Sequence, residues 1–228
     1  NVYEVTVRIV DNGSPALDDT QTLSVTVTDV DEAPSITSGG SASFAENGTG
    51  TVYTAIGSDP ESAALSYTLG GTDAGLFDIN AASGAVTFKV SPDYEAAGDS
   101  GANNVYDITV TASDGGLSSA AQAVAITVTD VNEAPVITSH GGGSSAAINV
   151  AENTTAVTTV TATDADSGQT KTYSISGGAD AAMFAIVPAT GVLTFASAPN
   201  YEVPADGDTD NVYEVTVRIV DNGSPALD

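Results

Sequence analysis

The chain contains no cysteine and no tryptophan, one histidine, and four lysine and arginine residues in total. Without cysteine it can form neither a disulfide framework nor a thiolate-bound metal site. A catalytic triad needs a histidine or a cysteine beside its nucleophile, and the single histidine, His140, stands alone beside a glycine-rich stretch. No lysine-bearing phosphate loop occurs either. We therefore expect that the protein is not an enzyme.

The scarcity of basic residues excludes further partners. Four lysines and arginines face 30 aspartates and glutamates, which gives a formal net charge of -26. Binding to nucleic acid requires a basic surface, and so does binding to an anionic lipid surface. No apolar run is long enough to cross a bilayer. We expect no nucleic-acid partner and no insertion into a membrane.

The acidity is not the mark of a disordered chain. Hydrophobic residues make up 41% of the sequence, and they recur in alternation with polar residues. So much negative charge on a compact protein repels itself unless positive charge lies among it. With few basic side chains to supply that charge, divalent cations are the expected counter-ions.

The sequence repeats itself on two scales. Residues 1–18 (NVYEVTVRIVDNGSPALD) recur letter for letter as residues 211–228, an offset of 210 residues. A looser repeat inside this period is seen in three pairs of segments: PDYE (92–95) with PNYE (199–202), FDINAASGAVTF (77–88) with FAIVPATGVLTF (184–195), and VTDVDEAPSITS (27–38) with VTDVNEAPVITS (128–139). The 210-residue unit is thus two modules of about 100 residues, the usual size of a β-sandwich domain.

Each module is predicted to consist of short β-strands. Val2–Val10 and Leu23–Thr28 alternate apolar and polar residues, and the turn-forming stretch DNGSP lies between them. In the central module we expect strands near 50–58, 64–69, 76–79, 85–88, 104–113 and 121–129. This spacing of short strands and turns predicts an all-β fold of sandwich modules arranged end to end.

The repeats also predict where the modules begin and end. Residues 1–34 correspond to the C-terminal two strands of one module, and residues 35–135 to a complete module. Residues 136–228 correspond to a module that lacks its final strand, and the missing strand is expected to read like residues 19–34.

The acidic residues gather at the module ends rather than on the strand faces. They occur in the linkers DVDEAP (29–34) and DVNEAP (130–135), in the AEN, Asp-x-acid and YE motifs of each module, and in the turn after a late strand. Calcium requires six to eight hard oxygen ligands and tolerates irregular geometry. Short acidic segments from separate loops supply such ligands, so the pattern predicts calcium sites at the module ends.

These motifs resemble those of the cadherin family. VTDVNEAP is similar to the D-x-N-D-N-x-P linker between cadherin repeats, AEN to its x-E-x motif, PDYE to L-D-R-E, and DAD at 164–166 to D-x-D. The motifs follow one another in the family's order, once per module. The resemblance, which extends to cadherin-like modules of large bacterial surface or RTX-type adhesins, implies an immunoglobulin-like Greek-key β-sandwich with Ca²⁺ at the linkers.

Carried over by motif, the resemblance implies one well-specified calcium site, at the junction of residues 35–135 with 136–228, where the family holds up to three ions. Its ligands would be Glu46, Asp93, Glu95, Asp130, Asn132, Glu133, Asp164, Asp166 and Asp221. The preceding junction offers Asp29, Asp31, Glu32, Asp59, Glu61 and Asp114, and the far end offers Glu152 and Glu202. Both outer sites are expected to be half-sites.

The predicted function is that of a calcium-rigidified tandem repeat in an adhesin or stalk, bacterial in origin and located outside the cell or at its surface. Its partners would be neighbouring copies of the repeat, and a cell-surface protein or glycan. Two alternatives remain open. One is a self-assembling extracellular filament or sheath, in which copies donate strands to one another. The other is a carbohydrate-binding module, which the absence of tryptophan disfavours.

Overall fold

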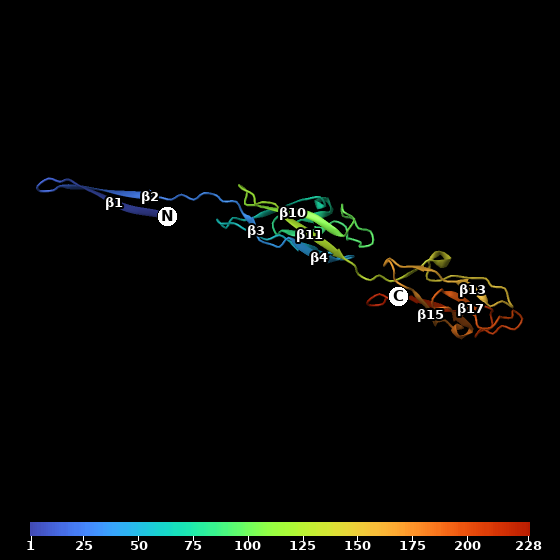
Figure 1. The fold of residues 1–228 in the computed structure, drawn as a ribbon. Coiled ribbons are helices and arrows are strands. Elements are labelled where there is room, and N and C mark those ends of the chain that lie inside the picture. The colour runs from blue at the N-terminus through green and yellow to red at the C-terminus, as the bar shows by residue number, and fades with distance from the viewer. The chain divides into compact units, whose positions relative to one another are not determined.

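The computed structural model describes residues 1–228 and consists of β-strands, loops and three 3-10 helices of three residues each (Figure 1). The strands up to residue 129 are β1 (Val2–Val10), β2 (Asp18–Thr26), β3 (Ser35–Ile36), β4 (Ser41–Ala45), β5 (Thr51–Thr54), β6 (Gly57–Ser58), β7 (Ser66–Gly70), β8 (Phe77–Ile79), β9 (Ala85–Phe88), β10 (Val105–Ser113) and β11 (Gln122–Thr129). The later strands are β12 (Val136–Ile137), β13 (Ala156–Thr159), β14 (Ala162–Thr163), β15 (Thr172–Gly177), β16 (Phe184–Ile186), β17 (Val192–Phe195) and β18 (Thr216–Val220). The 3-10 helices are η1 (Ala74–Leu76), η2 (Ser139–Gly141) and η3 (Ala181–Met183). None of these helices has the length and apolar character needed to cross a bilayer.

The chain divides into two compact units. The first comprises residues 1–43, 49–90 and 105–127, and the second comprises 44–48, 91–104 and 128–228. Two loop segments of the predicted central module therefore belong with the linker and the C-terminal residues. The predicted module boundaries at residues 34/35 and 135/136 stay predictions.

The strands from β4 to β11 form two antiparallel sheets and a short strand pair. One sheet has the order β4-β11-β10-β7, the other has the order β5-β9-β8, and β3 pairs with β6. Residues of β10 and β11 are buried at every second position, as expected for strands with one face in a core. Tyr106, on β10, lies 5.8 Å by ring centroid from Phe77 and 5.0 Å from Phe88, which belong to the other sheet. The two sheets thus face each other across an aromatic core, as in a β-sandwich.

The C-terminal strands repeat this arrangement 107 residues later. The strand orders are β13-β17-β16, β15-β18 and β12-β14. Phe184 stacks on Phe195 at 4.7 Å, and Tyr213 meets the edge of Phe195 at 5.1 Å, which reproduces the three-ring core at the equivalent positions. A second buried cluster joins Val160, Tyr173 and Ile219. The all-β architecture predicted from the repeats is confirmed.

The N-terminal hairpin differs in detail from the prediction. β1 and β2 pair antiparallel from Val2 opposite Thr26 to Val10 opposite Asp18, and every residue in both strands is exposed. Compared with the predicted second strand, 23–28, β2 begins five residues earlier and ends two residues earlier. Its first half, DDTQ, is polar on both faces, so it carries no alternation that would mark it as a strand. The short strands β3 and β4 were also missed.

Candidate metal centre

Glu46 lies at the centre of the acidic site, in the turn that follows β4. Its side chain is buried, with 3% of its surface exposed. The Oε2 atom accepts a 2.7 Å hydrogen bond from the backbone N–H of Tyr94, and Oε1 accepts a 2.8 Å bond from the N–H of Val131. One carboxylate therefore holds together the AEN turn, the PDYE loop and the linker, all of which belong to the second unit.

Three further acids converge on Glu46. Carboxylate oxygens of Glu46, Glu95, Asp130 and Glu133 all lie within 4.8 Å of one another. No lysine or arginine forms an ion pair with any of them, because the chain's ion pairs involve other acids. Four negative charges are thus held at close range with no positive side chain between them, which is costly unless a proton or a cation is shared.

The crowding shifts the pKa values of this group upward. Burial, followed by the negative charges of Glu46, Glu133 and Asp130, raises the pKa of Glu95 to about 7. Burial also raises the pKa of Asp130, with Asp166 as the strongest charged neighbour. The pKa of Glu133 is raised by burial and then by the charge of Glu46. Each shift thus has the same two causes, loss of solvent first and neighbouring negative charge second, and both disfavour the ionised carboxylate.

The linker is also bonded to the Asp-x-Asp turn that follows β14. The backbone N–H of Glu133 donates a 2.8 Å bond to Asp166 Oδ2, and Asp166 N–H donates a 3.2 Å bond to Asp164 Oδ1. On the other side, Asn47 Nδ2 donates a 2.6 Å bond to Glu133 Oε1. Glu133, a longer residue than the aspartate of the family motif, thus spans from the AEN turn to the Asp-x-Asp turn.

Two oxygen atoms of this group are buried without a hydrogen-bond partner: Glu133 Oε2 and Asp164 Oδ2. A buried carboxylate oxygen without a donor is strongly disfavoured, so these atoms favour a cation as their partner. All side chains here offer oxygen and none offers sulfur or imidazole nitrogen, which fits the preference of Ca²⁺ for hard oxygen ligands. The residues present therefore fit a calcium ion.

Asn132 takes part in a polar network beside the carboxylates. Its Nδ2 donates 2.9 Å bonds to Asp221 Oδ2 and to the carbonyl oxygen of Pro225, and its Oδ1 accepts a 2.5 Å bond from Gln169 Nε2. Burial disfavours the charged form of Asp221, but donors from Leu227, Asn132 and Gly223 outweigh burial and lower its pKa. Asp221 therefore stays ionised and anchors the linker to the turn after β18.

Some predicted ligands lie outside the tight group. Asp93 Oδ1 accepts a 3.0 Å bond from Ala96 N–H within its own turn, and Asp93 is not among the converging acids. Glu152 repeats the role of Glu46 toward the backbone, since its Oε2 accepts a 3.0 Å bond from Tyr201 N–H. Glu202, whose N–H donates to Asn200 Oδ1, closes a local turn. Glu152 and Glu202 stay predicted half-site residues.

The six acids predicted for the preceding junction lie in the first unit and gather less tightly. Glu32 N–H donates a 3.3 Å bond to Glu61 Oε2, which mirrors the bond between Glu133 and Asp166. Burial and then the charges of Asp114, Glu61, Asp59 and Asp29 raise the pKa of Asp31. The Oδ2 atoms of Asp59 and Asp114 are buried without a partner. No three of these six acids have carboxylate oxygens within 4.8 Å of one another, as the Glu46 group has.

Asn47 and Gln169 belong to the site but were not among the predicted ligands. Asn47 is the third residue of the AEN motif and recurs as Asn153, so the repeat carried a signal that could have found it. Gln169 has no such signal, because an alanine (Ala63 or Ala64) stands at the corresponding place in the central module. Only the fold brings Gln169 to the linker.

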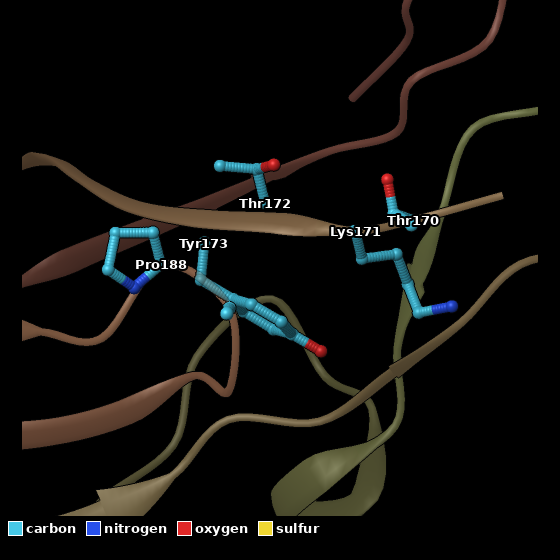
Figure 2. A pocket seen from close by; sticks show the side chains of 6 residues that line it. Thr170, Lys171, Thr172, Tyr173 and Pro188 are labelled. Atoms are coloured by element: carbon cyan, nitrogen blue, oxygen red, sulfur yellow. The ribbon is translucent and has the colours of Figure 1, made fainter.

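A shallow pocket lies beside β15 and contains none of these acids. It is lined by Thr170, Lys171, Thr172, Tyr173, Pro188 and Ala189 (Figure 2). The one aromatic ring, that of Tyr173, packs in the core with 7% of the residue exposed. It offers no open face on which a sugar could stack, so the pocket gives no support to the carbohydrate-binding alternative.

Comparison with known proteins agrees with this architecture. Residues 146–228 match the family described as the cadherin domain. The fold is that of cadherin repeats. A structure titled as the cis-dimer of Protocadherin gammaB7 EC3-6 covers 99% of this chain and 57% of that chain, with 26% identity and a TM-score of 0.58. Mouse Cadherin-23 EC22-24 covers 98% of this chain and 70% of that chain, with 25% identity and a TM-score of 0.55.

Curated relatives extend the similarity over most of the sequence. Mouse Protocadherin Fat 4 is 28% identical over 243 residues, which cover 98% of this chain and 5% of that protein. Human Protocadherin Fat 1 is 32% identical over 169 residues, which cover 72% of this chain and 3% of that protein. The chain thus spans about one twentieth of the length of the first of these relatives. These animal proteins give no support to the predicted bacterial origin or to the filament.

Proposed function

We propose that the chain is a calcium-binding segment of an extracellular array of cadherin-like repeats, in which Ca²⁺ stiffens the linker Asp130–Pro135. The observation that carries the proposal is the convergence of Glu46, Glu95, Asp130 and Glu133 within 4.8 Å without a basic partner. A divalent cation is the agent that best removes this repulsion, because it accepts several carboxylates at once.

In the proposed site, some residues would bind the ion and others would position the linker. Glu46, Glu95, Asp130 and Glu133 would hold the ion directly, and Asp166 and Asp164 would add carboxylates from the Asp-x-Asp turn. Glu133 Oε2 and Asp164 Oδ2, which are buried without partners, are the atoms that would gain most from the ion. Asn132 is already committed to Asp221 and Gln169, so it positions the linker. The number of ions stays a prediction.

Calcium would act on the linker more than on the fold of either module. For extracellular modules, affinities of about 0.1–1 mM are typical. At about 1 mM calcium, such a site adds roughly 0.4–1.4 kcal/mol of stability. This energy is small beside the stability of a domain, yet it is enough to hold Asp130–Glu133 against the Glu46 and Glu95 loops.

Chelation tests the proposal directly. The protein is transferred from about 2 mM CaCl₂, a concentration just above the typical affinity range of extracellular modules, to EDTA. We expect the radius of gyration measured by small-angle X-ray scattering to change and the melting temperature to fall by a few degrees. Mg²⁺ at the same concentration serves as the control, because its stricter octahedral geometry suits this irregular site less well. Identical scattering and melting curves in calcium and EDTA would contradict the proposal.

The pH dependence in EDTA provides a second test. The pKa of Glu95 is about 7 in the folded protein and 4.5 as its unperturbed value. Its contribution to stability is therefore fully present below about pH 4.5 and is lost as pH rises through about 7. We expect the metal-free protein to melt at a higher temperature at pH 5.5 than at pH 8.

Calcium should reverse this trend. The ion binds the deprotonated carboxylate, so it must displace the proton on Glu95 at pH 6, and its apparent affinity should be about tenfold weaker there than at pH 8. Isothermal titration calorimetry in buffers of different ionisation enthalpy would measure both the affinity and the released proton. An affinity independent of pH in this range would show that Glu95 is not a ligand.

Our proposals for adhesion and for the binding partners rest on similarity to known proteins. The relatives are cadherins and protocadherins by name, and one structural neighbour is described as a cis-dimer. By analogy with these, neighbouring copies of the repeat are the partners that we propose, at a cell surface or outside the cell. Strand donation into a filament and carbohydrate binding stay predictions.

A further inference from the structure

A second cluster of acids lies in the loop 206–211 (DGDTDN), which precedes β18 and plays no part in the linker site. Carboxylate oxygens of Asp206, Asp208 and Asp210 lie within 4.8 Å of one another. Asp206 is buried, with 4% of its surface exposed, whereas Asp208 and Asp210 are open to solvent.

Acids on a surface loop are common without a ligand, so the cluster needs independent support. The support is the Oδ1 atom of Asp206, which is buried and has no hydrogen-bond partner, while Oδ2 accepts a 2.7 Å bond from Asp210 N–H. An orphaned carboxylate oxygen inside a protein is unfavourable. No ion pair supplies the missing positive charge, because the chain's three ion pairs involve Asp18, Asp78 and Asp228.

The central module contains the same loop with a fully bonded carboxylate, and the buried oxygen without a partner there is the neutral amide Oδ1 of Asn104. Residues 99–104 (DSGANN) occupy the equivalent positions 107 residues earlier, and both loops have two residues with positive φ: Ala102 and Asn104 in one, Thr209 and Asn211 in the other. In the central loop both oxygens of Asp99 accept bonds, from the N–H groups of Asn103 and Asn104, at 2.9–3.2 Å. Gly101 and Asn103 stand there in place of Asp208 and Asp210.

The two loops thus have the same backbone conformation but differ in their number of carboxylates. The central loop carries one carboxylate, and backbone donors satisfy it. The C-terminal loop carries three carboxylates, and one buried carboxylate oxygen, Asp206 Oδ1, has no donor. The two additional acids, Asp208 and Asp210, lie close to the carboxylate of Asp206. Neither of them forms an ion pair with a lysine or arginine.

We propose that the loop 206–211 binds a divalent cation of the Ca²⁺ class through Asp206, Asp208 and Asp210, as a site separate from the linker. Known calcium loops begin with acidic ligands at their first, third and fifth positions. The sixth residue of such loops makes a sharp turn. Asn211, with φ of 66°, occupies that sixth position. Val217 stands at the twelfth position, where such loops place a glutamate, so water must complete the coordination shell.

The loop is held ready for the ion by its neighbours. Asp180, a buried residue, bonds to the start of the loop and to the chain beyond it: its Oδ1 accepts a 3.0 Å bond from Gly207 N–H, and its Oδ2 accepts a 2.9 Å bond from Glu214 N–H. Asn211 Nδ2 donates a 3.2 Å bond to the carbonyl oxygen of Tyr201. A bound cation would therefore require little further ordering. With three protein carboxylates, an affinity of about 0.1–1 mM is expected.

Titration of the complete ¹⁵N-labelled chain with CaCl₂, followed through amide resonances, tests this proposal. We expect the amides of Gly207, Asp210 and Asn211 to shift along a saturable curve up to about 10 mM calcium, while Asn103 and Asn104 stay in place. The double variant D208G/D210N, which gives the loop the central module's residues at those positions, should lose the saturable shift and leave that of Val131 unchanged.

The outcomes separate this site from the linker site. If Val131 and Tyr94 respond and the loop 206–211 does not, the proposal is overturned while the linker site stands. If the loop responds and Val131 does not, the linker site is wrong and the loop stands. A response of the loop that grows linearly without saturation indicates diffuse screening and overturns the proposal. The wild-type titration decides these cases even if the variant does not fold.

Discussion

Replacing Glu46 with glutamine is expected to weaken calcium binding at the linker at least tenfold and to destabilise the protein by about 1–3 kcal/mol. The two carboxylate oxygens each accept a backbone N–H, from Tyr94 and from Val131. An amide keeps only one acceptor, so its NH₂ group must face a buried N–H donor. The substitution also removes one of four converging charges. Calorimetric titration with calcium and chemical unfolding in EDTA measure the two effects separately.

In EDTA, the loss of stability caused by E46Q is partly offset by reduced repulsion among the remaining carboxylates. Glu46 contributes to the raised pKa values of Glu95, Glu133 and Asp130, so its removal relieves repulsion in the metal-free site. The E46Q variant should therefore lose more stability in calcium than in EDTA. It should also show a weaker pH dependence in EDTA than the wild-type protein.

Glu152→Gln is the matched control. Glu152 occupies the same AEN motif in the C-terminal module and accepts the N–H of Tyr201, but no other acid converges on it. The E152Q variant should keep the wild-type affinity at the linker and lose little stability, because Glu152 is exposed. Equal loss of affinity in the two variants would show that Glu46 acts through the fold and not as a ligand.

The internal repeats explain why so much of the fold could be predicted. A sandwich core needs large apolar residues at fixed intervals, and Phe77, Phe88 and Tyr106 recur 107 residues later as the same three-ring contact. Alternation also located β10 and β11 within a residue of their ends. Strands without such a pattern were misplaced or missed, as at the polar start of β2 and the two residues of β3.

The ligands are harder to predict than the strands, since their positions depend on loops. Glu46, Glu95, Asp130 and Glu133 come from three segments that converge only in the fold, and the repeat marks each segment without showing which oxygens meet. Asp93 carries an equally good motif and yet closes its own turn. The acids at 206–211 were overlooked because only one of the three recurs in the central module.

Gly223 packs directly against the linker residue Asn132. The substitution Gly223→Ala is therefore expected to lower the free energy of unfolding by about 1–3 kcal/mol. A Cβ atom at this position would lie 1.6 Å from Asn132 Oδ1 and 2.2 Å from its Cγ. Asn132 would have to leave the network, which breaks its bonds to Asp221, Pro225 and Gln169. The linker residue beside Glu133 would move with it, so calcium affinity should fall about tenfold, a loss of ~1.4 kcal/mol.

Gly13→Ala is a control with the same local sequence, because residues 1–18 are identical to residues 211–228. A Cβ atom at Gly13 would lie 3.2 Å and 3.6 Å from the two carboxylate oxygens of Asp11 and 3.3 Å from the carbonyl oxygen of Pro15, with no contact shorter than 3 Å. Both substitutions restrict the unfolded chain equally, so the difference between them isolates the collision with Asn132. Chemical unfolding and calcium titration of the two variants measure this difference. If G223A and G13A behave alike, Asn132 does not position the linker, and the bonds to Glu46, Asn47 and Asp166 hold it instead.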